Sequence, residues 1–302
     1  MPTYSVRAVR AVDFGVTDLE TAARFFSDVW NLTPVAGPAD EMLMRGTSAF
    51  HHILRLHRAP HLGLTRIVLD AADRAAVDGL HGQVISAGGM VDGTPRALAT
   101  GGYGFGCRDP EGRSFAVVCG IADHADAADR ADRPRKISHV NLNCADNEAT
   151  FTFMRDALGF RLSDQTRQFR FLRCDNADHH SMVIGFNKDA TLNHVAFEMP
   201  DDDSTMRGIG RMRDHGYPVE WGPGRHGPGN NVFAYFGDPE EMPLEYTSDM
   251  QQVGEDHRPR KPEEWSWPPG RVDHWGLTPG PSARVKRAQT LFRCSPEGYR
   301  LG

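Results

Sequence analysis

The sequence is poor in the residues that build disulfide frameworks and thiolate metal sites. Only five of its 302 residues are cysteines, and none of them forms a Cys-x-x-Cys pair. An odd number of scattered cysteines argues against a disulfide framework and against a zinc site built from thiolates. Few and scattered cysteines are typical of proteins in a reducing compartment, so we expect a cytoplasmic protein.

Long apolar runs and an excess of positive charge are also missing. No stretch is apolar over the length that a membrane-spanning helix needs, and the first residues contain no apolar core of a secretory signal. The formal net charge of -6 gives no basic footprint for nucleic acid. With 39% hydrophobic and 25% charged residues, the composition is that of a globular protein. We therefore expect no membrane and no nucleic acid among its partners.

An internal repeat organises the chain. Its first part reads as strand, helix and further strands, and the same pattern starts again at ISHVNLN. Each half contains the unit twice, which makes four units of about fifty to sixty residues. The correspondence is visible between DPEGRSFAVV and DPEEMPLEYT, and between FHHILRLH and DHHSMVIG. A repeat of this kind decides the architecture.

The repeat and the segments outside it define the predicted domains. The segment IADHADAADRADRPRK between the halves is short, charged and rich in Ala and Asp, and we interpret it as a linker with room for some helix. The tail after the second half has no counterpart in the repeat, and its tryptophans should pack on the active-site mouth or on a neighbouring subunit. The predicted boundaries are 1–122 for the N-terminal domain, 123–136 for the linker, 137–250 for the C-terminal domain and 251–302 for the Trp/Pro-rich tail.

The strand ISHVNLN has an unusually polar face. Val140 and Leu142 fall on one side of it, while His139, Asn141 and Asn143 fall on the other. The apolar side needs a core, whereas the polar side needs either water or a function. On its own the strand fits a surface position as well as it fits a site.

Two more residues give that polar face a function. His139, His194 and Glu245 each lie in the middle of a predicted strand of the second half. Two imidazoles and a carboxylate are the ligand set that binds Fe(II), and Mn(II) or zinc accept it too. The repeat acts as an internal control, because strand packing alone does not demand these residue types. At the corresponding positions the first half carries Asp13, Arg66 and Ala116.

These segments resemble the type I extradiol ring-cleaving dioxygenases of the vicinal oxygen chelate superfamily, which also includes glyoxalases and bleomycin resistance proteins. The resemblance covers roughly residues 6–249 and is specific at SHVNLN, DHHS, LNHVAFE, GRHGPGNNVFAYF and LEY. It implies an α+β fold of four βαβββ modules paired into two domains, with the metal in the C-terminal domain. It also implies that His139, His194 and Glu245 hold Fe(II) or Mn(II).

The resemblance implies further site residues. His180 falls where the family keeps its acid/base histidine, although the pair His51-His52 in the first half shows that paired histidines partly belong to the repeat. We expect His180 to share a strand face with Met182 and Ile184 and so to point into the metal cup. The other implied residues are Tyr235 and His226 beside the substrate hydroxyl, and Asn141, Phe171 and Asn193 in substrate binding.

The implied activity is insertion of both atoms of O2 into a catecholic substrate with meta ring cleavage, as part of aromatic compound catabolism. His180 first accepts a proton from the substrate and later returns it. Two alternatives stay open: another metal-dependent enzyme on the same scaffold, such as an isomerase or a keto-acid oxygenase, and a non-catalytic binding protein. We expect the protein to be a homo-oligomer.

Overall fold

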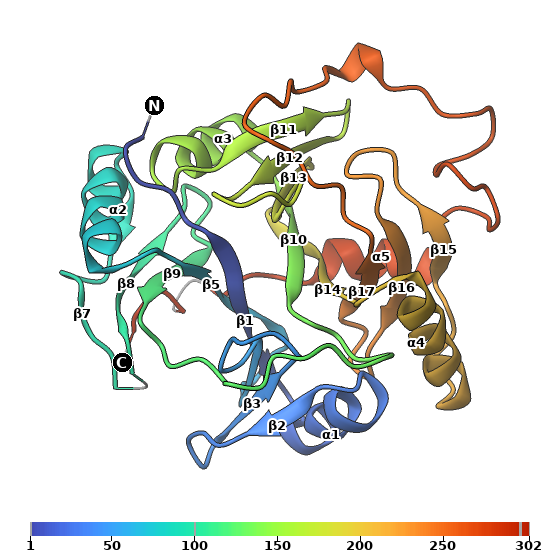
Figure 1. Cartoon of the computed structure of the whole chain (residues 1–302), viewed down its shortest axis with the longest axis horizontal. Coiled ribbons are helices and arrows are strands. Elements are labelled where there is room, and N and C mark those ends of the chain that lie inside the picture. The colour runs from blue at the N-terminus through green and yellow to red at the C-terminus, as the bar shows by residue number, and fades with distance from the viewer. Residues whose placement is uncertain (1, 100, 296–297, 302) are drawn as a thin grey trace.

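The computed structural model describes residues 2–99, 101–295 and 298–301 and contains two β-sheets (Figure 1). The strands of the first sheet are β1 (Ala8–Val16), β2 (Thr33–Val35), β3 (Glu41–Arg45), β4 (Leu54–Arg58), β5 (Gly63–Asp70), β6 (Met90–Val91), β7 (Arg96–Ala97), β8 (Tyr103–Arg108) and β9 (Ser114–Cys119). They follow the order β2-β3-β4-β1-β5-β9-β8-β6, with β7 paired to β8.

The second sheet repeats this arrangement. Its strands are β10 (Ile137–Cys144), β11 (Arg161–Gln165), β12 (Phe169–Arg173), β13 (Met182–Phe186), β14 (Thr191–Glu198), β15 (Trp221–Arg225), β16 (Val232–Gly237) and β17 (Pro243–Ser248). Their order is β11-β12-β13-β10-β14-β17-β16-β15. The two sheets thus share one topology, and the predicted fold of paired βαβββ modules is confirmed.

One helix crosses over within each module. The module helices are α1 (Leu19–Arg24), which continues as the π-helix η1 (Phe25–Val29), α2 (Arg74–Ser86), α3 (Asn147–Asp156) and α4 (Asp202–Asp214). Each begins after an aspartate whose carboxylate accepts a hydrogen bond from the backbone N–H three residues later, which satisfies one of the free donors of the first turn. These capping residues are Asp18, Asp73, Asp146 and Asp201.

A large apolar core joins the two halves of the chain. Its largest cluster of buried side chains draws on strands and helices of both sheets. At the centre Trp30 stacks on Tyr246 with ring centroids 3.8 Å apart, and the Tyr246 hydroxyl donates a hydrogen bond to the Trp30 carbonyl at 3.0 Å. Because these two residues come from different halves, the second sheet is fixed directly against the first module.

The strand pairing corrects one predicted counterpart. His139 lies opposite Ala196, which lies beside Glu245. The prediction that Asp13 corresponds to His139 is wrong, because Asp13 occupies the position of Asn141. Residues two apart share a strand face, so the alternation of apolar and polar residues cannot detect a shift by two. His139, Ala196 and Glu245 lie side by side on adjacent strands of the second sheet. The residues at the same positions of the first sheet are Ala11, Val68 and Ala116.

The first sheet carries an ion-pair cluster around Asp13. The Asp13 carboxylate accepts a hydrogen bond from Arg55 Nη1 at 3.1 Å and lies 3.6 Å from Nε of Arg66. A cavity of about 260 Å³ opens beside these side chains, and Leu301 forms part of its wall. The buried carboxylate of Asp13 is therefore neutralised by side chains of the protein itself.

The segment between the sheets contains no helix. Residues 121–136 run as an extended chain with one turn, so the helix for which the sequence left room is absent. Their backbone groups bond to other segments instead: His124 N–H donates to Ala49 O at 2.7 Å, and Arg135 N–H donates to Glu198 O at 2.7 Å. These contacts replace the hydrogen bonds that a helix would make within itself. The predicted domain boundaries stay predictions.

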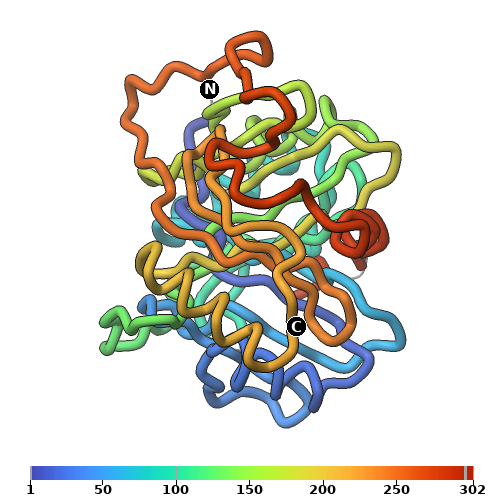
Figure 2. Tube along the Cα trace, turned by 90° about the vertical axis from the view of Figure 1, so that its right-hand side faces the viewer, coloured from blue at the N-terminus to red at the C-terminus, as the bar shows by residue number. Residues whose placement is uncertain are grey.

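The tail returns across both sheets, as the red end of the chain shows in Figures 1 and 2. It contains the short 3-10 helix η2 (Pro262–Glu264) and α5 (Ala283–Leu291). The backbone N–H of His179 donates to Gln251 O at 2.8 Å, and Leu64 of the first sheet forms a bridge with Cys294. Among the described residues, no helix has the length and apolar character that crossing a membrane requires.

Candidate metal centre

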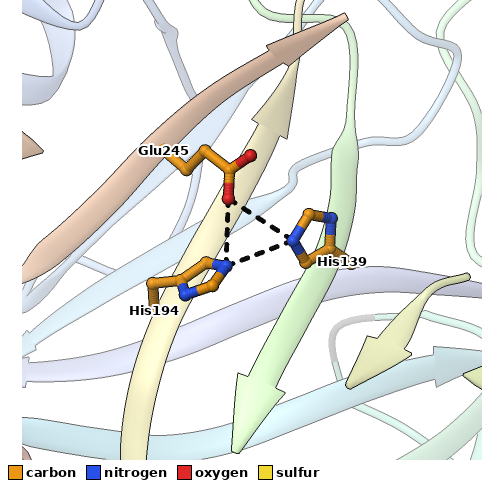
Figure 3. A group of neighbouring side chains, drawn as sticks. All are labelled: His139, His194 and Glu245. Carbon is orange, nitrogen blue, oxygen red and sulfur yellow. Dashed lines mark hydrogen bonds and ion pairs between the residues drawn. The ribbon is translucent and has the colours of Figure 1, made fainter. Parts of the chain in front are cut away.

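Three adjacent strands in the centre of the second sheet carry the predicted metal ligands. β10 holds His139, β14 holds His194 and β17 holds Glu245. β14 lies between the other two, antiparallel to β10 and parallel to β17. Ala196 faces His139 on one side and Glu245 on the other, and His194 is two residues away from it in the same strand. All three side chains therefore point to one face of the sheet and toward one another (Figure 3).

One atom of each side chain approaches a common point. The Nε2 atoms of His139 and His194 lie 3.2 Å apart. Oε2 of Glu245 lies 3.0 Å from Nε2 of His194 and 3.5 Å from Nε2 of His139. The side chains of the three residues are buried, and Glu245 is fully inaccessible to solvent. The structure thus brings together the three residues singled out in the sequence.

The Glu245 carboxylate shows that these residues fit a divalent cation. Both of its oxygens are buried, and neither accepts a hydrogen bond from the described residues. A buried carboxylate needs opposite charge close by, and a cation between the three donor atoms would supply it. Two imidazole nitrogens and one carboxylate oxygen suit Fe(II), Mn(II) or zinc.

The charge state of the cluster agrees with this assignment. Burial raises the pKa of the Glu245 carboxyl, but the neighbouring imidazoles of His139 and His194 lower it by more, so that the pKa lies well below its ordinary value. Burial also lowers the pKa of His194. A carboxylate and a neutral imidazole are the forms that bind a metal.

A row of amide side chains orients His194. Nδ1 of His194 lies 2.8 Å from Oδ1 of Asn193, and Nδ2 of Asn193 donates to Oδ1 of Asn143 at 3.1 Å. Asn143 donates in turn to Oγ1 of Thr191 at 2.9 Å. Because the amide nitrogen of Asn193 faces Asn143, its oxygen faces His194 and fixes the proton on Nδ1. Nε2 of His194 then keeps its lone pair for a metal.

A cavity of about 440 Å³ opens beside these ligands and includes His139 and His194 in its wall. Its volume is in the range of ordinary small-molecule sites. Every other residue predicted for catalysis or substrate binding lines the same cavity. These residues are His180, Tyr235, His226, Asn141, Phe171 and Asn193.

Comparison with known proteins shows the family. The model of the glyoxalase/bleomycin resistance protein/dioxygenase superfamily matches residues 136–246, which include all three ligands. The crystal structure of the Mn(II)-bound glyoxalase from Novosphingobium aromaticivorans is 37% identical in sequence, with a TM-score of 0.86 over 92% of this chain and 93% of that chain. This chain belongs to the glyoxalase/bleomycin resistance protein/dioxygenase superfamily.

Two further proteins are similar to this chain, one over a shorter stretch and one in fold alone. Metapyrocatechase 2 from Cupriavidus necator is 32% identical over 139 residues, and this match spans 45% of this chain but only 41% of that protein's length. The homoprotocatechuate 2,3-dioxygenase from Arthrobacter globiformis is 20% identical, with a TM-score of 0.84 over 99% of this chain and 95% of that chain. The latter likeness shows a common fold.

His180 lines the cavity, but it does not lie on the strand on which the sequence placed it. The prediction that it shares a strand face with Met182 and Ile184 is wrong, because β13 begins only at Met182 and both of these side chains lie in the apolar core. His180 belongs to the irregular segment before the strand. Its ring centroid lies 5.2 Å from that of Phe171, edge to face, and 4.6 Å from that of His139. The backbone outside the strand lets its side chain turn toward the metal ligands.

His226 and Tyr235 form a polar pair next to the ligands. Nε2 of His226 lies 3.2 Å from the Tyr235 hydroxyl, which lies 3.5 Å from Nε2 of His194. The His226 ring stacks on Phe233 with centroids 3.9 Å apart, which holds it against the cavity wall. Burial lowers the pKa of His226 to about 4 and raises the pKa of Tyr235 well above its ordinary value. The pair is therefore a neutral imidazole and a protonated phenol.

The sequence did not show which other residues complete the cavity. Residues of the tail form part of its wall, as expected for one of the two positions that the sequence left open, and contact with a neighbouring subunit stays a prediction. The only signal for this in the sequence was the concentration of Trp and Pro. The cavity residues that sequence reasoning missed are Thr166, Gln168, Phe169, Val183 and Trp221 of the second half, and Trp267, Arg271, Val272, Pro281 and Gln289 of the tail.

Proposed function

We propose that this protein is an extradiol dioxygenase. It opens the ring of a catecholic substrate beside the two hydroxyl groups, and both atoms of O2 end in the ring-opened product. The observation that carries the proposal is the presence of His180 and of the His226–Tyr235 pair in the cavity of the three metal ligands. An acid/base group, a hydrogen-bond donor and a metal are what such a reaction needs in one place. The similarity to metapyrocatechase 2 supports the same reaction class.

We propose Fe(II) as the metal, with Mn(II) as the alternative. An ion of either kind would supply Lewis acidity toward two adjacent hydroxyl groups and a binding position for O2. The ligand set accepts both ions. The 37% identical glyoxalase structure holds Mn(II), so Fe(II) has to be established by measurement.

The side chains of the cavity would bind the substrate and move its proton. His180 accepts a proton from one hydroxyl of the catechol and returns it as the ring opens. The Tyr235 hydroxyl, held by His226, donates a hydrogen bond to a substrate oxygen. Oδ1 of Asn141 is buried in the same cavity and has no hydrogen-bond partner among the described residues, so it can accept a hydrogen bond from a bound molecule. Phe171 forms an apolar wall for the ring.

The experiment that tests the proposal combines metal analysis with oxygen uptake. Protein purified without air is analysed for metal, loaded separately with Fe(II) and with Mn(II), and given a panel of substituted catechols in an oxygen electrode. We expect O2 consumption together with a yellow ring-opened product for at least one catechol. Bound metal without O2 uptake on any catechol would contradict the proposal and favour an isomerase, whereas no metal would favour a binding protein. The ion that restores turnover decides between iron and manganese.

Replacing Trp267 with alanine is expected to weaken substrate binding more than turnover. Trp267 belongs to the cavity wall and stacks on Trp265, with ring centroids 5.9 Å apart. An aromatic contact contributes about 0.5–1.5 kcal/mol, so KM should rise by up to about tenfold while kcat changes little. Trp275→Ala is the matched control, because Trp275 lies in the same tail but outside the cavity wall. Equal changes in KM for both variants would contradict this role of Trp267.

A further inference from the structure

His179 connects His180 to a buried carboxylate. Nδ1 of His180 lies 3.0 Å from Nδ1 of His179, and Nε2 of His179 lies 2.8 Å from Oδ2 of Asp164. All three side chains are buried, and those of His179 and Asp164 are fully inaccessible to solvent. A continuous line of hydrogen-bonding atoms therefore runs from the wall of the cavity into the interior of the protein.

The chemistry of these groups places each proton. Burial raises the pKa of Asp164, but hydrogen bonds from His179 and from the backbone of Arg260 lower it by more, so the group is a carboxylate. Burial lowers the pKa of His179, which is therefore neutral. A carboxylate only accepts, so the single N–H of His179 is on Nε2 and its Nδ1 is an acceptor. The contact between the two Nδ1 atoms then requires the proton on Nδ1 of His180.

The tail fixes the carboxylate from the other side. The backbone N–H of Arg260 donates to Oδ1 of Asp164 at 2.7 Å, and its Nη2 donates to Oδ2 at 3.2 Å. Asp164, His179 and His257 are close enough to hold a metal ion. However, the guanidinium of Arg260 already neutralises the carboxylate, and His257 Nε2 lies 3.0 Å from the Ser163 carbonyl. The cluster is therefore better described as a hydrogen-bonded relay than as a second metal site.

The first half of the chain shows what is special about this relay. There, His51 and His52 make the same contact, with their Nδ1 atoms 3.1 Å apart. The strand position of Asp164, however, is taken by Val35, as the pairing of the strands shows. Paired histidines thus belong to the common scaffold. The carboxylate behind His179 is found in the half that also carries the metal ligands.

We propose that Asp164 and His179 are positioning residues that hold His180 in the tautomer with its proton on Nδ1. Nε2 of His180 is then the atom that accepts the proton of the substrate. This inference rests on the proposed function of His180 as the acid/base group. In other enzymes a buried carboxylate behind a catalytic histidine fixes the orientation of the ring and its tautomer without taking up the proton. We expect Asp164, acting through His179, to have the same effect on His180.

Nitrogen NMR of the histidine side chains tests the relay without any turnover. The full chain is labelled with 15N and loaded with Zn(II), a diamagnetic ion that accepts the same ligands, and the signals are assigned with His179→Gln and His180→Gln variants. We expect a protonated Nδ1 in His180 and a protonated Nε2 in His179. A proton on Nε2 of His180 overturns the proposal. This readout separates failure of the relay from failure of the dioxygenase function, which would appear as absence of O2 uptake by the unmodified protein.

Asp164→Asn provides the second test. The backbone N–H of Arg260 keeps the amide oxygen on its side, so the amide NH2 faces His179 and should reverse both tautomers. We expect a fall in kcat of about 10²-fold or more, with KM and metal content unchanged. His51→Gln is the matched control, because it breaks the same contact between paired histidines in the other half and should leave kcat unaltered. Full kcat in Asp164→Asn, or an equal loss in His51→Gln, contradicts the proposal.

Discussion

Replacing Glu245 with alanine is expected to abolish both metal binding and turnover. The carboxylate is fully buried, and neither of its oxygens accepts a hydrogen bond from the described residues. Without this carboxylate, the two remaining imidazoles are too few to hold a divalent ion tightly in competition with water. His139→Ala should have the same effect, because it removes one of the two nitrogen ligands.

Thermal unfolding measures this loss independently of activity. A metal present at about 100 times its Kd stabilises the folded protein by about 2.7 kcal/mol, which appears as a rise in Tm for the unmodified chain. We expect no such rise for Glu245→Ala or for the isosteric Glu245→Gln. Asp13→Asn is the matched control, since it also removes a buried strand carboxylate but should keep one metal per chain. A Glu245 variant that retains stoichiometric metal or full turnover would show that the metal lies elsewhere.

Replacing His180 with glutamine is expected to lower kcat by about 10²-fold to 10⁴-fold, the usual contribution of a general acid/base group. His180 lines the cavity, with its ring centroid 4.6 Å from that of His139. It is not one of the three converging ligands. Metal content should therefore stay at one ion per chain, while the proton that must leave the substrate has lost its acceptor.

The repeat offers a control for this variant as well. His52 is the counterpart of His180 and makes the same contact with its own neighbouring histidine. His52→Gln should leave kcat unaltered, because no metal ligands surround it. Metal analysis and steady-state kinetics on both variants decide the matter. An unchanged kcat in His180→Gln would remove this residue from the mechanism, and loss of metal would make it a ligand.

The three residues of the candidate metal centre were predictable because the repeat separates functional residues from those that only build the fold. Two sheets of the same topology need strands at the same places, but only one of them carries His139, His194 and Glu245 there. The residue of the first half that corresponds to His139 was harder to identify from the sequence. Since side chains two residues apart share a strand face, the pattern did not distinguish Asp13 from Ala11 as the partner of His139, and only the strand pairing settles it.

The residues that surround the candidate site could not be predicted from the sequence, and the physical reason is a different one. Asp164 lies in the polar segment SDQTR, and its role depends on contacts with His179 and with Arg260 of the tail. Such contacts join residues far apart in the sequence and leave no local period or spacing. His180 was placed on a strand that begins two residues later, because the boundary of a strand depends on its hydrogen bonds and not on side-chain alternation.

The position of the tail has a consequence for how the protein matures. Residues 251–302 leave the ribosome after every strand of the second sheet has been made, at a pace of about 5–20 residues per second. The part of the cavity wall that Trp267 and Gln289 provide emerges only after the strands that carry His139, His194 and Glu245. The strands that carry His139, His194 and Glu245 are therefore all available for pairing before the tail can complete the wall of the cavity beside them.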